Sequence, residues 1–167
     1  EAVDYEADDI IATYTTAAQK KARFAMSLDR SFTYRLHLLS KLTDRVSQHA
    51  YREETGLSIS DGRCLATIGS FEPLSIMDLA LQANLNKGQA SRAAQALVDL
   101  GYVSKEDRPD DGRGVVLTLT PAGRGMWERT MDVIRQRNEQ ICSCLNPNER
   151  QTLSALLDRL IEHARQP

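Results

Sequence analysis

The segment 85–123 constrains the fold of this chain more than any other. Apolar residues recur at helical spacing over 86–100, and short apolar runs typical of strands follow at 102–103 and 115–119. A turn of basic and acidic residues, 107–113, separates these two runs. A helix followed directly by a two-stranded β-ribbon is the arrangement of a winged helix, a fold that commonly inserts its helix into the major groove of DNA.

A helix-turn-helix pattern leads into this ribbon. Ser75 with Asp78, and Asn86 with Gln89, each pair an N-cap residue with a side chain three positions later that can return a hydrogen bond. They predict two helices joined by the short turn 82–85, as a helix-turn-helix requires. In that motif the first residues of the second helix face the edges of the bases.

The side chains at that helix start and at the ribbon tip suit DNA. Gln pairs bidentately with adenine, Arg or Lys pairs with guanine, and Ser bonds either a base or a phosphate. A basic tip can follow the phosphates or enter a narrow minor groove. We therefore predict DNA contacts from Asn86, Lys87, Gln89, Ser91 and Arg92 in the helix and from Arg108 and Arg113 in the tip.

Charge and cysteine content narrow the classes of protein that the chain can be. The net charge of -2 argues against a non-specific nucleic-acid coat, yet it allows a binder whose positive charge is confined to one face. Residues 86–113 hold five basic and five acidic side chains, so binding depends on how these are arranged. No apolar run approaches the roughly 18 residues of a membrane span, and no signal peptide is visible. Three cysteines without CxxC spacing favour a reducing cytoplasm.

Long apolar stripes at both ends of the sequence predict a helical dimerisation region. Helical patterns cover 8–27 and about 29–54, and a helix opened by Thr120 and Pro121 carries an apolar seam from Trp127 to Leu145 that needs a partner helix. One small winged helix cannot cover these stripes, so we predict a homodimer. Its interface is predicted to include Trp127, Met131, Ile134, Ile141, Leu153, Leu156, Leu157 and Leu160.

The predicted fold class is therefore mostly α with a small β-ribbon, a winged helix-turn-helix plus a helical dimerisation region. The expected parts are N-terminal helices over 1–54, the winged helix-turn-helix over 55–120 and C-terminal dimerisation helices over 121–167.

The ribbon resembles the wing of the MarR family of bacterial transcriptional regulators. Residues 111–123 read Asp-x-Arg, then a hydrophobic strand ending Leu-Thr-x-x-Gly, and the spacing matches without a gap. The run 86–92, with the exit 100–103, is similar to the family's recognition helix. The resemblance covers about 28–165 and implies a homodimer with interleaved terminal helices that binds a palindromic operator in double-stranded DNA. It also implies DNA contact by Ser91 and Arg92, a minor-groove role for Arg113, and Asp111 as the acid that orients it.

Members of this family usually release DNA when a small molecule, often an aromatic acid, binds between the dimer helices and the winged helix. The resemblance makes Tyr34, His37 and Arg63 candidate effector residues. Each also fits a plain surface role, since His37 shares a polar face with Lys41 and Asp44, and Arg63 lies early in its helix. We expect a repressor that an effector releases by shifting the population of its conformations.

Two other functions stay open at this point. One is a cysteine-based redox regulator, for which Cys64 looks buried and Cys142 and Cys144 would fall on different faces of a helix. The other is a winged helix that binds protein. We expect no metal, because His37 and the other histidines lack HxxxH spacing, and no cofactor or enzyme activity, because no phosphate loop or nucleophile elbow occurs.

Overall fold

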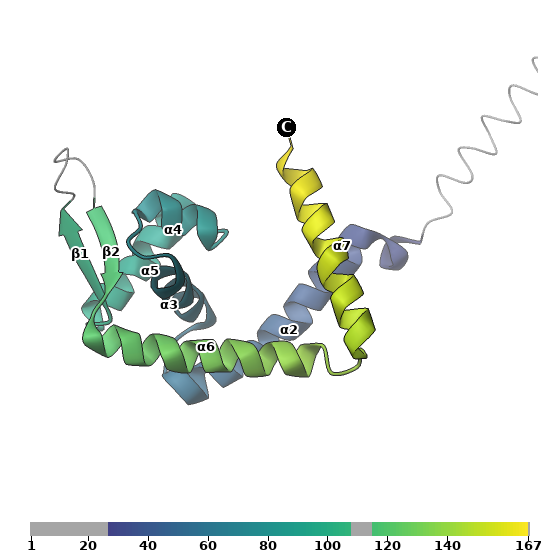
Figure 1. Ribbon diagram of the computed structural model, residues 1–167, viewed down its shortest axis with the longest axis horizontal. Coiled ribbons are helices and arrows are strands. Elements are labelled where there is room, and N and C mark those ends of the chain that lie inside the picture. Colours follow the sequence, from purple (N-terminus) through teal and green to yellow (C-terminus); the bar gives the residue numbers. More distant parts are fainter. Residues whose placement is uncertain (1–26, 108–114, 167) are drawn as a thin grey trace, which may run out of the picture. The chain divides into compact units, whose positions relative to one another are not determined.

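The chain is mostly α-helical with one small antiparallel sheet, as the sequence predicts. The computed structural model describes residues 27–107 and 115–166. The helix predicted over 8–27 lies outside these residues. The elements, in order, are the 3-10 helix η1 (Leu28–Arg30), α2 (Phe32–Thr55), α3 (Ile59–Phe71), α4 (Ile76–Gln82), α5 (Lys87–Asp99), β1 (Val103–Asp107), β2 (Val115–Leu119), α6 (Pro121–Ile141) and α7 (Pro147–Arg165) (Figure 1).

Two compact units divide the chain, residues 1–43 and 44–167. The described part of the first unit is η1 and the first half of α2, where the apolar side chains are exposed. In the second unit, the rest of α2 contacts α3 and α6. The ring of Tyr51 fills the space beside Gly62, and Arg137 Nε donates to Ser47 Oγ at 3.2 Å.

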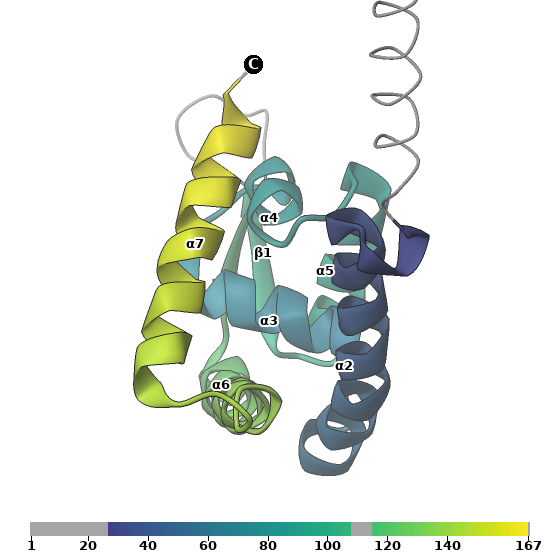
Figure 2. The same cartoon turned by 90° about the vertical axis from the view of Figure 1, so that its right-hand side faces the viewer.

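The core of the second unit lies where α3, α4 and α5 meet the sheet (Figure 2). Burial of a large aliphatic side chain stabilises a fold by roughly 1.5–3 kcal/mol, and such residues dominate this cluster. α5 contributes small residues on its inner face, which let it approach α3 and α4 closely. The fully buried members of the cluster include Leu65, Ile68, Leu79, Ala90, Ala94, Leu97 and Leu117.

The predicted N-caps form, and they set where the helices begin. Ser75 and Asp78 exchange the two hydrogen bonds of a capping box at the start of α4. Asn86 and Gln89 do the same for α5. Between these helices the chain turns at Asn84, whose φ of 54° is in the left-handed region that asparagine tolerates better than most residues.

The sheet has a short third partner that the sequence did not predict. β1 pairs antiparallel with β2, from Val103 opposite Leu119 to Asp107 opposite Val115. Leu74, between α3 and α4, adds a bridge to the other edge of β2. Its N–H donates to Leu117 O at 3.3 Å and its carbonyl accepts from Leu117 N at 2.8 Å. The bridge ties the wing to the start of the helix-turn-helix.

Glu72 joins the end of the wing to α6. One carboxylate oxygen accepts a hydrogen bond from Leu119 N at 2.6 Å, and the other pairs with Arg124. The Arg124 guanidinium lies 5.8 Å from the centre of the Trp127 ring, within cation–π range. The indole Nε1 donates to Ala66 O at 3.2 Å, so this cluster also reaches α3.

The helix α6 ends earlier than the apolar seam suggested. It stops at Ile141, Cys142 is its C-cap, and Leu145 lies in the turn before α7. The interpretation that Cys142 and Cys144 lie on two faces of a helix is therefore wrong. Asn146 begins α7 with its own capping box, and this new helix start interrupts the seam.

The base of the wing is a close contact between backbone segments. Thr120 N donates to Tyr102 O at 3.0 Å, and Thr120 Oγ1 donates to Gly101 O at 2.6 Å and accepts from Gly123 N at 3.0 Å. A Cβ at Gly123 would lie 1.8 Å from Tyr102 O. Only glycine fits at position 123 while α5, the ribbon and α6 keep this arrangement.

We expect Gly123→Ala to lower the free energy of unfolding by at least about 2 kcal/mol, because the new methyl group overlaps a backbone carbonyl that three hydrogen-bonded segments hold in place. Gly125→Ala is the matched control. It lies in the same helix with nothing within 4 Å of the added Cβ, and it should stabilise the protein by roughly 0.5–1 kcal/mol. Urea denaturation measures both, and equal stabilities for the two variants would contradict the contact.

Candidate nucleic-acid interface

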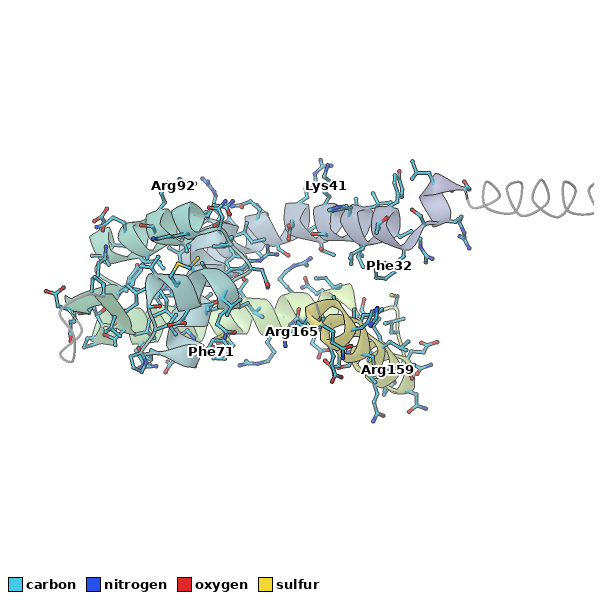
Figure 3. The ribbon with its side chains drawn as sticks, turned by 90° about the horizontal axis from the view of Figure 1, so that it is seen from above. Phe32, Lys41, Phe71, Arg92, Arg159 and Arg165 are labelled. Carbon is cyan, nitrogen blue, oxygen red and sulfur yellow. The ribbon has the colours of Figure 1, made fainter. Side chains whose placement is uncertain are left out.

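The outer face of α5 carries the five helix residues predicted to contact DNA, and all five side chains are exposed. The opposite face holds Ala90, Ala93, Ala94 and Leu97 in the core, so the helix cannot rotate to hide the polar face. Figure 3 shows Arg92 on the outer side of α5, pointing away from the body. The exposed set is Asn86, Lys87, Gln89, Ser91 and Arg92.

Positive charge gathers at the start of α5. A Cβ at Gly88 would lie 3.6 Å from Arg92 Nη1, so the guanidinium lies back over the first turn of the helix. Lys87 is exposed on the same turn, and the helix dipole adds a partial positive charge at this end. Asp99 lies at the far end of α5. The charges of α5 are therefore separated along the helix, with the cations at the end that an anion would approach.

The exposed side chains of β1 are less favourable to DNA. Lys105 Nζ donates to Gln95 Oε1 at 3.3 Å, and Gln95 Nε2 donates to Asp99 Oδ1 at 2.8 Å. Glu106 and Asp107 follow, both exposed. The tip residues Arg108, Asp111 and Arg113 lie outside the described residues, so their contacts with DNA stay a prediction.

The three candidate effector residues fall in different units. Tyr34 and His37 are exposed on α2 in the first unit. Arg63 is exposed on α3 in the second unit, where its Nη2 lies 2.5 Å from Asp44 Oδ1. A shared role for them in an effector site stays a prediction.

The residues predicted for dimerisation divide into two groups. On α6, Trp127 packs against the core, where Gly69 leaves space for its ring, and Met131, Ile134 and Ile141 are half-buried. On α7, the leucines are 40–47% exposed, although they share one side of an amphipathic helix. An open apolar depression of about 430 Å³ lies at the start of α7. The exposed leucines are Leu153, Leu156, Leu157 and Leu160.

Within 27–107 and 115–166, no three His, Cys, Asp or Glu side chains come together in a way that could hold a metal ion. None of the helices in these ranges is long and apolar enough to cross a membrane.

Known proteins similar to this chain are transcriptional regulators. A model of the MarR family matches residues 55–114. The regulator BilQ of Clostridium symbiosum is 25% identical over 65% of this chain and 75% of its own length. A MarR-family regulator from Silicibacter pomeroyi has a solved structure with a TM-score of 0.71 and 26% identity, covering 84% of this chain and 94% of that one.

The same fold occurs in BpsR of Bordetella bronchiseptica, whose DNA binding is regulated by 6-hydroxynicotinic acid. Its structure has a TM-score of 0.74 with 19% identity, and the match covers 81% of this chain and 96% of BpsR.

The three cysteines differ sharply in environment. Cys64 is fully buried, and burial, with a smaller contribution from Asp61, raises the pKa of its thiol from 9.0 to about 11. Cys142 is half-buried and Cys144 is exposed. Because the thiolate is the reactive form of cysteine, Cys64 is poorly suited to sensing an oxidant.

We expect iodoacetamide at pH 8 to modify Cys144 in the native protein at least about 100-fold faster than Cys64, because Cys144 is exposed whereas Cys64 is fully buried and burial raises the pKa of its thiol to about 11. Peptide mass spectrometry measures both rates, with the urea-unfolded chain as the control in which they converge. Burial raises the pKa of Cys64 in the native protein, so the unfolded chain loses this proton at a lower pH than the native protein does. The free energy of unfolding should therefore fall as the pH rises from 9 to about 11. Equal native rates at the two cysteines would contradict the burial of Cys64.

Proposed function

Because the chain belongs to the MarR family of DNA-binding transcriptional regulators, we propose that it is a homodimeric repressor that binds a palindromic operator and is released by a small, aromatic-acid effector. The family is not an enzymatic one. Because the protein would act on DNA, we place it in the cytoplasm. The winged helix-turn-helix, 55–120, would bind DNA, and the segments 1–54 and 121–167 would supply the dimer.

The observation that carries the DNA-reading role is the exposed, polar, basic start of α5. No large apolar side chain is exposed among residues 86–92. A protein-binding surface normally has an apolar centre, so this surface fits DNA better than a protein partner. Arg108, Asp111 and Arg113 are the further residues that we propose to contact DNA.

The apolar side of α7 supports the dimer. Its leucines and Ile161 are exposed, and the apolar depression beside Leu145 lies at the start of the helix. Exposed apolar surfaces of this kind mark interaction sites in soluble proteins, and two-fold homodimers are the commonest oligomers. A second copy of the chain is the partner we propose, because two reading helices about 34 Å apart would then meet two half-sites.

The effector proposal depends on a conformational equilibrium. A ligand that binds one spacing of the reading helices better than another shifts the dimer toward that spacing, and it releases DNA if the favoured spacing no longer matches the operator. The regulation of BpsR by 6-hydroxynicotinic acid makes aromatic acids the first class to test. Tyr34, His37 and Arg63 are the residues we propose for it, and a redox regulator would instead depend on Cys142 or Cys144.

We expect Arg92→Ala to weaken binding to a duplex selected by the wild-type protein by about tenfold or more, because a guanidinium at the start of α5 is lost. If Arg92 also contacts phosphate, the salt dependence of binding should become shallower by about one counterion. Arg52→Ala removes the same charge from an exposed position of α2 and is the control. Fluorescence anisotropy across salt concentrations measures both variants. Wild-type affinity of Arg92→Ala at every salt concentration would exclude α5 as the reading helix.

We expect Leu160→Glu to raise the dimer dissociation constant by at least about tenfold, because it introduces a charge into an apolar interface. Ala155→Glu adds the same charge to the opposite side of α7 and should leave the dimer intact. Sedimentation velocity over a concentration series measures both. The proposed interface fails if the two variants dissociate equally, or if Leu160→Glu stays a dimer at every concentration.

A further inference from the structure

The oxygens of the two amide side chains at the start of α5 each accept a hydrogen bond within the helix cap. Asn86 Oδ1 accepts a hydrogen bond from Gln89 N at 2.9 Å, and Gln89 Oε1 accepts one from Asn86 N at 3.0 Å. These two bonds form the capping box that begins the helix. Among the described residues, neither amide nitrogen donates a hydrogen bond, and both side chains are exposed. The two NH₂ groups are therefore wholly free for a partner, while each oxygen keeps one lone pair.

Reading adenine with glutamine requires both ends of the amide at once. The oxygen accepts from adenine N6, while the nitrogen donates to adenine N7. With Oε1 bonded to the Asn86 backbone, Gln89 could pair in this way only by breaking the cap or by dividing its oxygen between two donors. Donation from Nε2 alone needs neither change, so the capping box favours a base that accepts hydrogen bonds.

The neighbouring side chains offer donors as well. Arg92 lies back over the first turn beside Gly88, and Lys87 is exposed on that turn. Guanidinium and ammonium groups have no acceptor, and Ser91 can donate. The positive end of the helix dipole adds to the same preference. Guanine presents two adjacent acceptors in the major groove, O6 and N7, and thymine presents O4. Adenine presents N7 beside the N6 donor, which a donor surface leaves unpaired, and cytosine presents only a donor.

We propose that the start of α5 reads DNA mainly through hydrogen-bond donors, and that the capping box makes Gln89 favour guanine or thymine over adenine. This proposal rests on the proposed DNA-binding function and names the bases that the function requires. It replaces the bidentate Gln–adenine pair that the residue type alone suggested.

The test is selection of duplexes from a random pool by the full chain, for the wild type and for Gln89→Glu. Glutamate is the usual partner in a capping box, so Gln89→Glu keeps the cap and exchanges the NH₂ donor for an acceptor oxygen. We expect one position in each half-site to change from guanine or thymine to cytosine, whose N4 amine donates to a carboxylate. The preference at that position should reverse by about tenfold, and the melting temperature should stay within a few degrees.

Two further variants make the result specific. Gln95→Glu makes the same chemical change on the same helix, where Gln95 bonds Asp99 and Lys105, and its selected sequence should equal that of the wild type. Asn86→Ser keeps an N-cap oxygen and removes the other free NH₂ group. It should relax the preference for an acceptor base at an adjacent position without changing the one that depends on Gln89.

The other outcomes overturn either the proposed base preference or the DNA-binding function on which it rests. If the wild type selects adenine at the position that changes in Gln89→Glu, the capping box does not direct Gln89 away from adenine and the proposal is wrong, while DNA binding stands. If no position changes in Gln89→Glu, Gln89 reads no base and the proposal is again wrong. If the wild type enriches no sequence at all, the proposed function itself fails.

Discussion

The carbonyl oxygen of Tyr102 occupies the position where a side chain at residue 123 would begin. Around this contact the end of α5, the start of β1, the end of β2 and the start of α6 come together, and Thr120 bonds three of these segments. A reading helix is useful only if the rest of the molecule fixes its position. In the motif Leu-Thr-x-x-Gly, the Thr120 hydroxyl supplies hydrogen bonds and Gly123 leaves room for the Tyr102 carbonyl. Glu72 adds a second link, from β2 to Arg124 of α6.

Local features of the fold could be predicted from the residues, because their causes lie within a few positions. An N-cap and its partner three residues on define a helix start whatever surrounds them, and Ser75, Asn86 and Asn146 all behave in this way. Contacts between distant segments could not be predicted. Leu74 gives no strand signal alone, and it pairs with Leu117 only because α3 and the wing lie side by side.

The same distinction applies to the candidate site. Spacing indicates that Trp127 and Met131 share a face of α6, but it does not indicate what covers that face. In the structure Trp127 packs against α3, where Gly69 leaves room, while the leucines of α7 are exposed. Likewise, the residue type makes Gln89 a candidate for adenine. Only the capping geometry reveals that its oxygen is already bonded.

A protein with a net charge of -2 can bind DNA when its cations and anions are separated in space. On α5 the separation follows the helix, with Lys87 and Arg92 at the start and Asp99 at the end. The cations thus coincide with the positive end of the helix dipole and with the free amide donors. Donors and positive charge at the same helix end favour the same partner, an edge rich in acceptors. In the function proposed here, the capping box that begins the helix would therefore also bias which bases the helix reads.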